Sequence, residues 1–152
     1  MTDKGKPFVL MIEDDPNDAA LFRRALRKSN LPTPVTVIDD GEAAVRWLRE
    51  KAEASPAGDP EWPRIIVLDL KMPRRSGLEV LEWLRTQPGG RRVPVVVFTS
   101  SRESRDIARA YALGVNSYLV KPVSFDAWKE MIRTMHHYWM DLNERPEPAG
   151  GG

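Results

Sequence analysis

The feature that most constrains the fold is an apolar run that ends abruptly at a carboxylate. Residues 65–68 are all apolar, and Asp69 follows them directly. A run of this length without alternation is typical of a strand buried on both faces, and such strands belong to parallel sheets covered by helices. Because Pro73 comes soon afterwards, no helix begins at once, so Asp69 is predicted at the carboxyl end of a central strand. Open α/β sheets bind their ligands at that end.

Other short runs along the chain also have strand character, and segments with helical spacing of apolar residues separate them. The additional strands are expected at residues 8–12, 35–38, 95–98 and 117–120. Five strands that alternate with five helices predict a three-layer α/β domain with a parallel sheet. The last helix is expected from about Ser124 to Leu142.

The 152 residues suit one domain, which we expect to span residues 1–144. Residues 51–63 contain four prolines or glycines without periodicity and predict a surface loop, and residues 145–152 predict a disordered tail. About thirty residues follow the fifth strand, so we expect one helix and a tail there and no DNA-binding domain.

Composition excludes several classes of function. A net charge of +1 gives no general attraction to nucleic acid or anionic membranes, and the absence of cysteine excludes disulfides and thiolate metal sites. The first residues lack the order of a signal peptide, and no apolar run approaches the length of a membrane span. We therefore expect a cytoplasmic protein that binds neither nucleic acid nor membrane.

Polar side chains follow four of the apolar strands. They are Glu13 and Asp14, Asp69, Thr99, and Lys121. The carboxyl ends of parallel strands lie at one edge of the sheet, so these groups are predicted to converge. Closely packed carboxylates repel one another unless a cation neutralises them or one of them takes up a proton. An all-oxygen ligand set favours Mg²⁺, with Mn²⁺ as an alternative.

Other polar residues have simpler interpretations. Acids near the start of a helix commonly serve as turn or N-cap residues, which we expect for Asp15, Asp18, Asp39 and Asp40. The adjacent His136 and His137 face different sides of a helix, so we expect surface or interface residues and not metal ligands. The Arg74–Arg75 pair is expected to be solvated.

With these residues in place, the sequence closely resembles the receiver domain of two-component response regulators. The resemblance covers residues 8 to about 138. It depends on I-E-D-D-P after the first strand, L-D-L-K-M-P with Gly77 after the third, F-T-S-S after the fourth, and Y-L-V-K-P at the fifth. It implies a flavodoxin-like (βα)5 fold with strand order 2-1-3-4-5.

The resemblance also implies the roles of the site residues. Asp69 would accept a phosphoryl group, and Mg²⁺ would be held by Asp14, by Asp69, by the main-chain carbonyl of Lys71, and by Glu13 through water. Lys121, joined to Pro122 by a cis peptide bond, would pair with Asp69 and then bind the phosphoryl group together with Thr99 and Ser100. Thr99 and Tyr118 would form a switch pair.

A more particular resemblance is to the stand-alone regulators that partner bacterial and cyanobacterial phytochromes. The features that carry it are Glu13-Asp14 followed by Asp15-Pro16, the loop at 51–63, Arg74-Arg75 before Ser76-Gly77, and the ending Y-W-M-D-L-N-E-R-P. It implies a sensor histidine kinase of the bacteriophytochrome type as partner and output through protein contacts, with a downstream phosphotransfer protein as a further possible partner.

Such a protein is a phosphoacceptor and not an enzyme, apart from its own phosphoryl transfer and slow autodephosphorylation. Lys71 and Ser101 flank the phosphate and carry no carboxylate or amide to orient an attacking water. Two alternatives stay open. A phosphatase of the haloacid dehalogenase type also uses an aspartate after a strand, but it has a second acid where this chain has Lys71. A phosphorylation-independent binding module would not need the acids, Thr99 and Lys121.

The last predicted helix has more apolar surface than one stripe against the sheet requires. Met131, Tyr138, Trp139 and Leu142 add aromatic and apolar side chains towards its end. Exposed patches of this composition mark interfaces. We therefore expect a homodimer that forms through this helix, although the last turn folding back over its own domain is an alternative.

Overall fold

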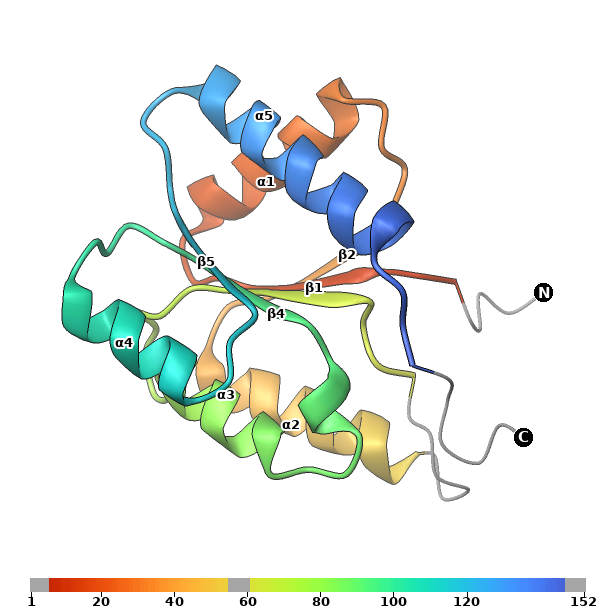
Figure 1. Cartoon of the computed structure of the whole chain (residues 1–152), viewed down its shortest axis with the longest axis vertical. Coiled ribbons are helices and arrows are strands. Elements are labelled where there is room, and N and C mark those ends of the chain that lie inside the picture. Colours follow the sequence, from red (N-terminus) through yellow and green to blue (C-terminus); the bar gives the residue numbers. More distant parts are fainter. Residues whose placement is uncertain (1–5, 55–60, 147–152) are drawn as a thin grey trace.

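The computed structural model describes residues 6–54 and 61–146, and it has the predicted three-layer α/β architecture (Figure 1). Five parallel strands form one sheet in the order β2-β1-β3-β4-β5. The strands are β1 (Val9–Ile12), β2 (Val35–Ile38), β3 (Ile65–Leu68), β4 (Val95–Thr99) and β5 (Ser117–Val120). The helices are α1 (Pro16–Lys28), α2 (Gly41–Glu53), α3 (Gly77–Arg85), α4 (Ser104–Ala112) and α5 (Phe125–His136), with a 3-10 turn η1 (Gly90–Arg92) and a π-helical segment η2 (His137–Leu142).

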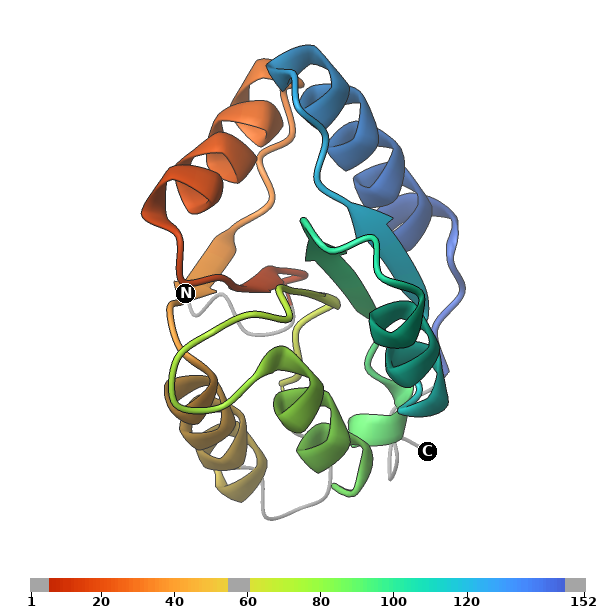
Figure 2. The same ribbon diagram turned by 90° about the vertical axis from the view of Figure 1, so that its left-hand side faces the viewer.

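The helices cover both faces of the sheet. Helices α1 and α5 pack together on one face, α2 and α3 pack together on the other, and α4 lies beside β5 (Figure 2). Successive side chains of a strand point to opposite faces, so Leu10 and Ile12 enter the core under α2 and α3, whereas Val9 and Met11 enter the core under α1 and α5. Every residue of β1, β3 and β4 is buried, which confirms that these strands are covered on both sides.

The register of the strands places the polar residues that follow them side by side. Ile12 lies opposite Leu68, and the backbone N–H of Asp69 donates to the Ile12 carbonyl at 3.0 Å. Glu13 and Asp69 therefore leave the sheet at the same level. In the neighbouring strand pair, Thr99 of β4 lies opposite Val120 of β5. Lys121, the next residue, therefore lies at the same edge of the sheet.

Several element boundaries differ from those predicted. Strand β1 begins at Val9 and not at residue 8, and β4 ends at Thr99 and not at residue 98. Helix α2 continues to Glu53, into the segment predicted to be a loop. The last helix reaches Leu142 as predicted, but its final turns are π-helical from His137 onwards. Residues 55–60 of the predicted loop and 147–152 of the predicted tail lie outside the described residues.

Across the two described stretches, no helix has both the length and the apolar character that crossing a bilayer requires.

Candidate functional site

Asp69 occupies the position predicted for it, at the carboxyl end of the central strand β3. Its side chain is largely buried, and its Oδ1 accepts a hydrogen bond from the Leu70 N–H at 2.7 Å. Gly77, the first residue of α3, lies against the same turn. A Cβ at Gly77 would lie 2.1 Å from the Asp69 carbonyl oxygen, so only glycine allows α3 to approach this closely. The backbone of β1 and the start of α3 thus fix the position of the acid.

Glu13 and Asp14 bring two further carboxylates to this edge. One carboxylate oxygen from each of Glu13, Asp14 and Asp69 lies within 4.8 Å of the other two. Glu13 is buried and Asp14 is exposed. Oxygen-only ligand sets of this kind suit hard divalent cations, which also relieve the repulsion among the carboxylates. The donor set therefore fits the predicted cation.

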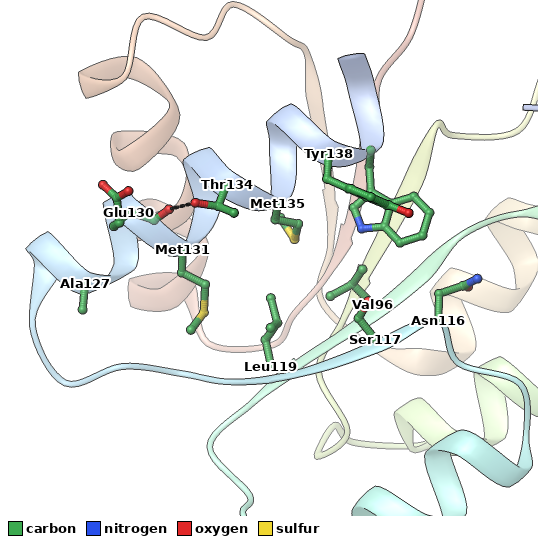
Figure 3. A pocket seen from close by; sticks show the side chains of 11 residues that line it. Val96, Asn116, Ser117, Leu119, Ala127, Glu130, Met131, Thr134, Met135 and Tyr138 are labelled. Atoms are coloured by element: carbon green, nitrogen blue, oxygen red, sulfur yellow. Dashed lines mark hydrogen bonds between the residues drawn. The ribbon is translucent and has the colours of Figure 1, made fainter. Parts of the chain in front are cut away.

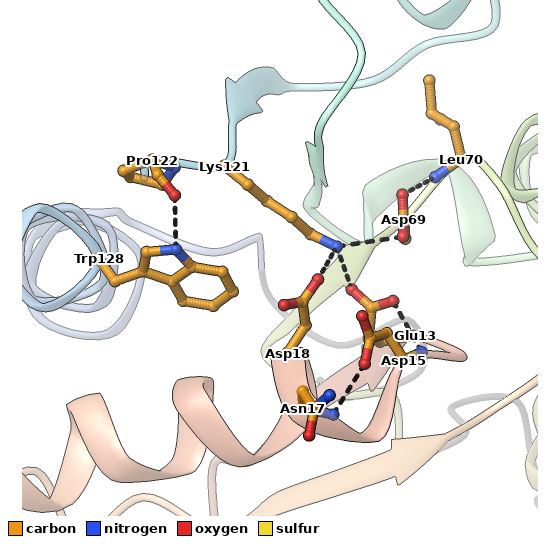
Figure 4. A network of polar contacts seen from close by, with 9 residues as sticks. All are labelled: Glu13, Asp15, Asn17, Asp18, Asp69, Leu70, Lys121, Pro122 and Trp128. Carbon is orange, nitrogen blue, oxygen red and sulfur yellow. Dashed lines mark hydrogen bonds and ion pairs between the residues drawn. The ribbon is translucent and has the colours of Figure 1, made fainter. Parts of the chain in front are cut away.

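Lys121 completes the site from the end of β5 (Figure 4). Its peptide N–H donates to the Thr99 carbonyl at 2.8 Å. Its ammonium lies 2.6 Å from Glu13 Oε1, 2.7 Å from Asp18 Oδ2 and 3.2 Å from Asp69 Oδ2. The predicted contact between Lys121 and Asp69 is present, but it is the longest of the three.

Burial and charge shift the protonation of this network. Burial raises the pKa of Glu13 to about 7, the hydrogen bond from Lys121 opposes that rise, and the charge of Asp69 adds to it. Burial by itself lowers the pKa of Lys121, but the hydrogen bonds to Asp18 and Glu13 and the charge of Asp69 outweigh burial and raise that pKa. Lys121 therefore stays an ammonium ion across the physiological pH range.

Asp18 is a site residue that the sequence interpretation missed. Asp15 and Asp40 are N-caps as predicted, since Asp15 accepts from the Asn17 N–H at 2.8 Å and Asp40 from the Ala43 N–H at 2.7 Å. The same expectation for Asp18 was wrong, because its carboxylate pairs with Lys121. The only available signal was its place in the first turn of the helix that directly follows the acidic end of β1.

The predicted switch residues lie at the end of β4 and in β5, and both adjoin the loop after β4. Thr99 is buried at the end of β4, and Tyr118 donates its hydroxyl hydrogen to the Ser101 carbonyl at 3.0 Å. Ser100 is exposed, whereas the hydroxyl of buried Ser101 donates to the Asp106 carboxylate. Tyr118 is therefore tied to the loop that Thr99 begins.

In the loop after β3, Arg74 is exposed, as predicted, whereas Arg75 departs from the prediction of solvated arginines because it is only partly exposed. Arg75 pairs with Glu42 at 3.0 Å, and Arg74 lies 3.8 Å from Asp40, so both arginines contact the start of α2. The Lys71 side chain is exposed.

The cis bond implied before Pro122 is absent, because no peptide bond of the described residues is cis. An Xaa–Pro bond prefers trans only weakly, so the local sequence does not decide between the isomers. The Pro122 carbonyl accepts a hydrogen bond from Trp128 Nε1 at 2.8 Å, which connects the loop after β5 to α5.

His136 is buried within its own domain, which corrects the expectation that both histidines are surface or interface residues. Its Nε2 lies 2.7 Å from Thr33 Oγ1 in the segment between α1 and β2, and its Nδ1 is buried without a partner among the described residues. His137 is exposed, as expected, and pairs with Asp141 at 3.0 Å.

The four residues predicted at a dimer interface differ in exposure. Tyr138 and Leu142 are 49% and 58% exposed, whereas Met131 and Trp139 are partly buried against their own core. Met131, Tyr138 and Trp139 line a groove of about 780 Å³ between β5 and α5 (Figure 3). Leu119 and Met135 add further apolar lining.

Comparison with known proteins supports one family. The model of the response regulator receiver domain matches residues 9–133. The chain is 37% identical to the probable methanogenesis regulatory protein FilR2 of Methanothrix harundinacea, over 94% of this chain and 90% of that protein. It is 32% identical to the response regulator Rcp1 of a Synechocystis species, over 96% of this chain and 99% of that protein.

Solved structures give the same result. The phosphorylated cyanobacterial phytochrome response regulator RcpA superposes with a TM-score of 0.82 at 30% identity, over 94% of this chain and all of that one. The Mn²⁺-bound form of Rcp1 gives 0.78 at 30% identity, with 93% and 100% covered. The bacteriophytochrome response regulator AtBRR gives 0.66 at 40% identity, with 91% and 99% covered.

Proposed function

The chain belongs to the response regulator receiver domain family, and from this membership we propose that it accepts a phosphoryl group on Asp69 from a sensor histidine kinase. Receiver domains are phosphoacceptor signalling proteins and not enzymes. The observation that carries the assignment to Asp69 is its place at the end of β3, with the Lys121 ammonium 3.2 Å away and the carboxylates of Glu13 and Asp14 beside it.

The proposed cofactor is Mg²⁺, with Mn²⁺ as a substitute. In this proposal Asp14 and Asp69 would bind the ion directly, and Glu13, which is buried and holds the Lys121 ammonium at 2.6 Å, would act through water. The carbonyl of Lys71 is a further ligand in this proposal. The Mn²⁺-bound form of the relative Rcp1 supports a divalent ion at such a site. The ion supplies positive charge to the oxygens of the transferring group.

In the proposed reaction, an Asp69 carboxylate oxygen forms a bond to phosphorus while the bond from phosphorus to the kinase histidine breaks. The product is an aspartyl phosphate and a free histidine. Lys121, Thr99 and Ser100 bind the phosphoryl oxygens. Movement of the buried Thr99 towards those oxygens changes the loop to which Tyr118 is hydrogen-bonded, and this carries the signal to the face formed by α4, β5 and α5.

The proposed kinase is a phytochrome. RcpA is a cyanobacterial phytochrome response regulator and AtBRR a bacteriophytochrome response regulator, and both align with almost the whole of this chain. Output then passes through protein contacts, with a phosphotransfer protein as one possible recipient. Cytoplasmic localisation stays a prediction of the sequence.

A transfer experiment tests both parts of the proposal. Phosphorylated kinase domains from a bacteriophytochrome and from an unrelated sensor are each mixed with the protein in the presence of Mg²⁺. We expect faster transfer from the phytochrome kinase and none to Asp69→Asn. Equal rates from the two kinases would contradict the phytochrome assignment, and no transfer from any donor would favour the phosphorylation-independent binding module.

We also propose that a second copy of the chain occupies the groove between β5 and α5. The groove is lined largely by apolar side chains, Tyr138 in its lining is half exposed, and Leu142, four residues further along the chain, is also exposed. Aromatic and methionine side chains are enriched in protein interfaces. A dimeric regulator would also match the two-fold symmetry common among kinases of this type.

A further inference from the structure

The Lys121 ammonium has no donor to spare in this structure. It contacts one carboxylate oxygen from each of Glu13, Asp18 and Asp69 (Figure 4). An ammonium ion carries three N–H donors, so these three contacts account for all of them. Any additional acceptor near Asp69 must therefore displace one of the existing partners.

Asp18 differs from the other two partners of Lys121. Glu13 and Asp69 belong to the cluster of carboxylates that lie within 4.8 Å of one another, and Asp18 does not. Its side chain lies in the first turn of α1 and is 22% exposed, whereas that of Glu13 is 1% exposed. Its contact with Lys121, at 2.7 Å, is nonetheless shorter than the contact between Lys121 and Asp69.

Lys121 does not need Asp18 in order to reach the site. Its backbone is held by the hydrogen bond to the Thr99 carbonyl, its side chain is 7% exposed, and Glu13 binds the ammonium at 2.6 Å. The contribution of Asp18 is instead a second strong acceptor for the ammonium that is not a member of the acid cluster. A phosphoryl group on Asp69 adds negative oxygens that require a hydrogen-bond donor. Asp18 competes with these oxygens for the N–H groups of Lys121.

We infer that Asp18 is a positioning residue that holds the Lys121 ammonium back and must release it when a phosphoryl group occupies Asp69. This role depends on the proposed phosphoacceptor function. Asp18 therefore weakens binding of a phosphoryl group to the site, and it sets how readily the protein enters the phosphorylated state. The relevant property is competition for the Lys121 ammonium. Asp18 is neither the acid that carries the reacting oxygen nor a member of the carboxylate cluster predicted to bind the metal.

Beryllofluoride, a non-reacting mimic of a phosphoryl group, provides the test. Its affinity is measured by calorimetry at saturating Mg²⁺ for the wild type, Asp18→Asn, Asp18→Glu and Asp15→Asn. Asp15→Asn is the matched control, because it removes one charge from the same end of α1, keeps an N-cap and does not contact Lys121. We expect Asp18→Asn to bind about three- to tenfold more tightly than Asp15→Asn. Asp18→Glu, which retains the charge, should bind like the wild type.

The possible outcomes separate this role from the function on which it depends. Wild-type protein that binds no beryllofluoride would refute the phosphoacceptor function itself. Wild-type binding with equal affinities for Asp18→Asn and Asp15→Asn would overturn the competition, and weaker binding by Asp18→Asn would show that Asp18 assists the lysine. Unfolding of each variant in urea controls for the fold, and a merely structural role of Asp18 would change stability without tightening beryllofluoride binding.

Discussion

Glu13 and Asp14 are neighbours in the chain but have different environments. The buried carboxylate of Glu13 is fully engaged, by the Lys121 ammonium and by the Asp15 N–H. The exposed carboxylate of Asp14 belongs to the acid cluster and is open to solvent. At the scale of single residues, Glu13 therefore holds the lysine, whereas Asp14 is the acid that the proposed cation would contact directly.

Replacing Asp14 by Asn should weaken Mg²⁺ binding by about tenfold or more, since a direct carboxylate ligand is lost. Asp15→Asn should stay within about twofold of the wild type, because Asp15 caps α1 and lies outside the cluster. Calorimetric titration with Mg²⁺ measures both constants. Equal losses in the two variants would mean that the ligand has been assigned to the wrong acid.

Individual side chains were predictable from the sequence where a strand ends. Glu13, Asp69, Thr99 and Lys121 follow apolar runs, and parallel topology alone brings such positions to one edge. Asp18 was not predictable in this way. Its contact depends on how α1 is rotated about its axis, and only the packing of α1 against α5 and the sheet determines that rotation.

At the scale of elements, His136 connects the end of α5 to the segment between α1 and β2 through its contact with Thr33. Glu130, Arg133, His137 and Asp141 are the charged or titratable residues that line the pocket beside it. Burial lowers the pKa of His136 below 6.5, the charge of Asp141 opposes that effect, and His137 adds to it. The neutral imidazole is therefore the form that the fold favours.

This preference predicts a loss of stability in acid. Because the folded-state pKa is depressed, the unfolded chain binds more protons as the pH falls below 6.5, and the free energy of unfolding decreases. Urea unfolding at about pH 7.5 and about pH 5.5 should show a larger decrease for the wild type than for His136→Gln, whose amide does not titrate. His137→Gln is the control, since His137 is exposed. An equal decrease in wild type and His136→Gln would exclude His136 as the source.

Strands were easier to predict than helix ends. The bounds of β2, β3 and β5 agree with the apolar runs because the polar residues after these strands mark where regular pairing stops. The change from α5 to the π-helical η2 has no comparable local signal. Trp139 and Met140 both pack against the core from this segment, so tertiary contacts accompany the altered winding.

At the scale of the whole molecule, the proposed dimer predicts that exposed residues at the end of α5 control association. Tyr138→Lys combined with Leu142→Glu should shift the protein to monomer in light scattering, without lowering phosphoacceptance. Tyr138 and Leu142 are better sites for substitution than Trp139, because Trp139 packs against the core of its own domain. Tyr111→Lys on α4 is the matched control, because Tyr111 is 51% exposed and lies outside the groove. A wild-type protein that is monomeric at micromolar concentration, phosphorylated or not, would disprove the dimer.

The sequence predicted the architecture of the whole molecule because strand and helix patterns, crossover handedness and the receiver motifs all agree. It did not predict how apolar surface at the end of α5 divides between the protein's own core and solvent. That division depends on the three-dimensional course of η2, which brings Trp139 inward and leaves Tyr138 and Leu142 exposed.

The most direct test of the central claim is whether Asp69 alone carries the phosphoryl group. Wild type and Asp69→Asn are incubated with acetyl phosphate and Mg²⁺, and intact masses are recorded before and after treatment with hydroxylamine, which cleaves acyl phosphates. We predict that the wild type gains the mass of one phosphoryl group, loses it in hydroxylamine, and that the folded Asp69→Asn variant gains none. Uptake of hydroxylamine-sensitive phosphate by Asp69→Asn at the wild-type rate would contradict the assignment.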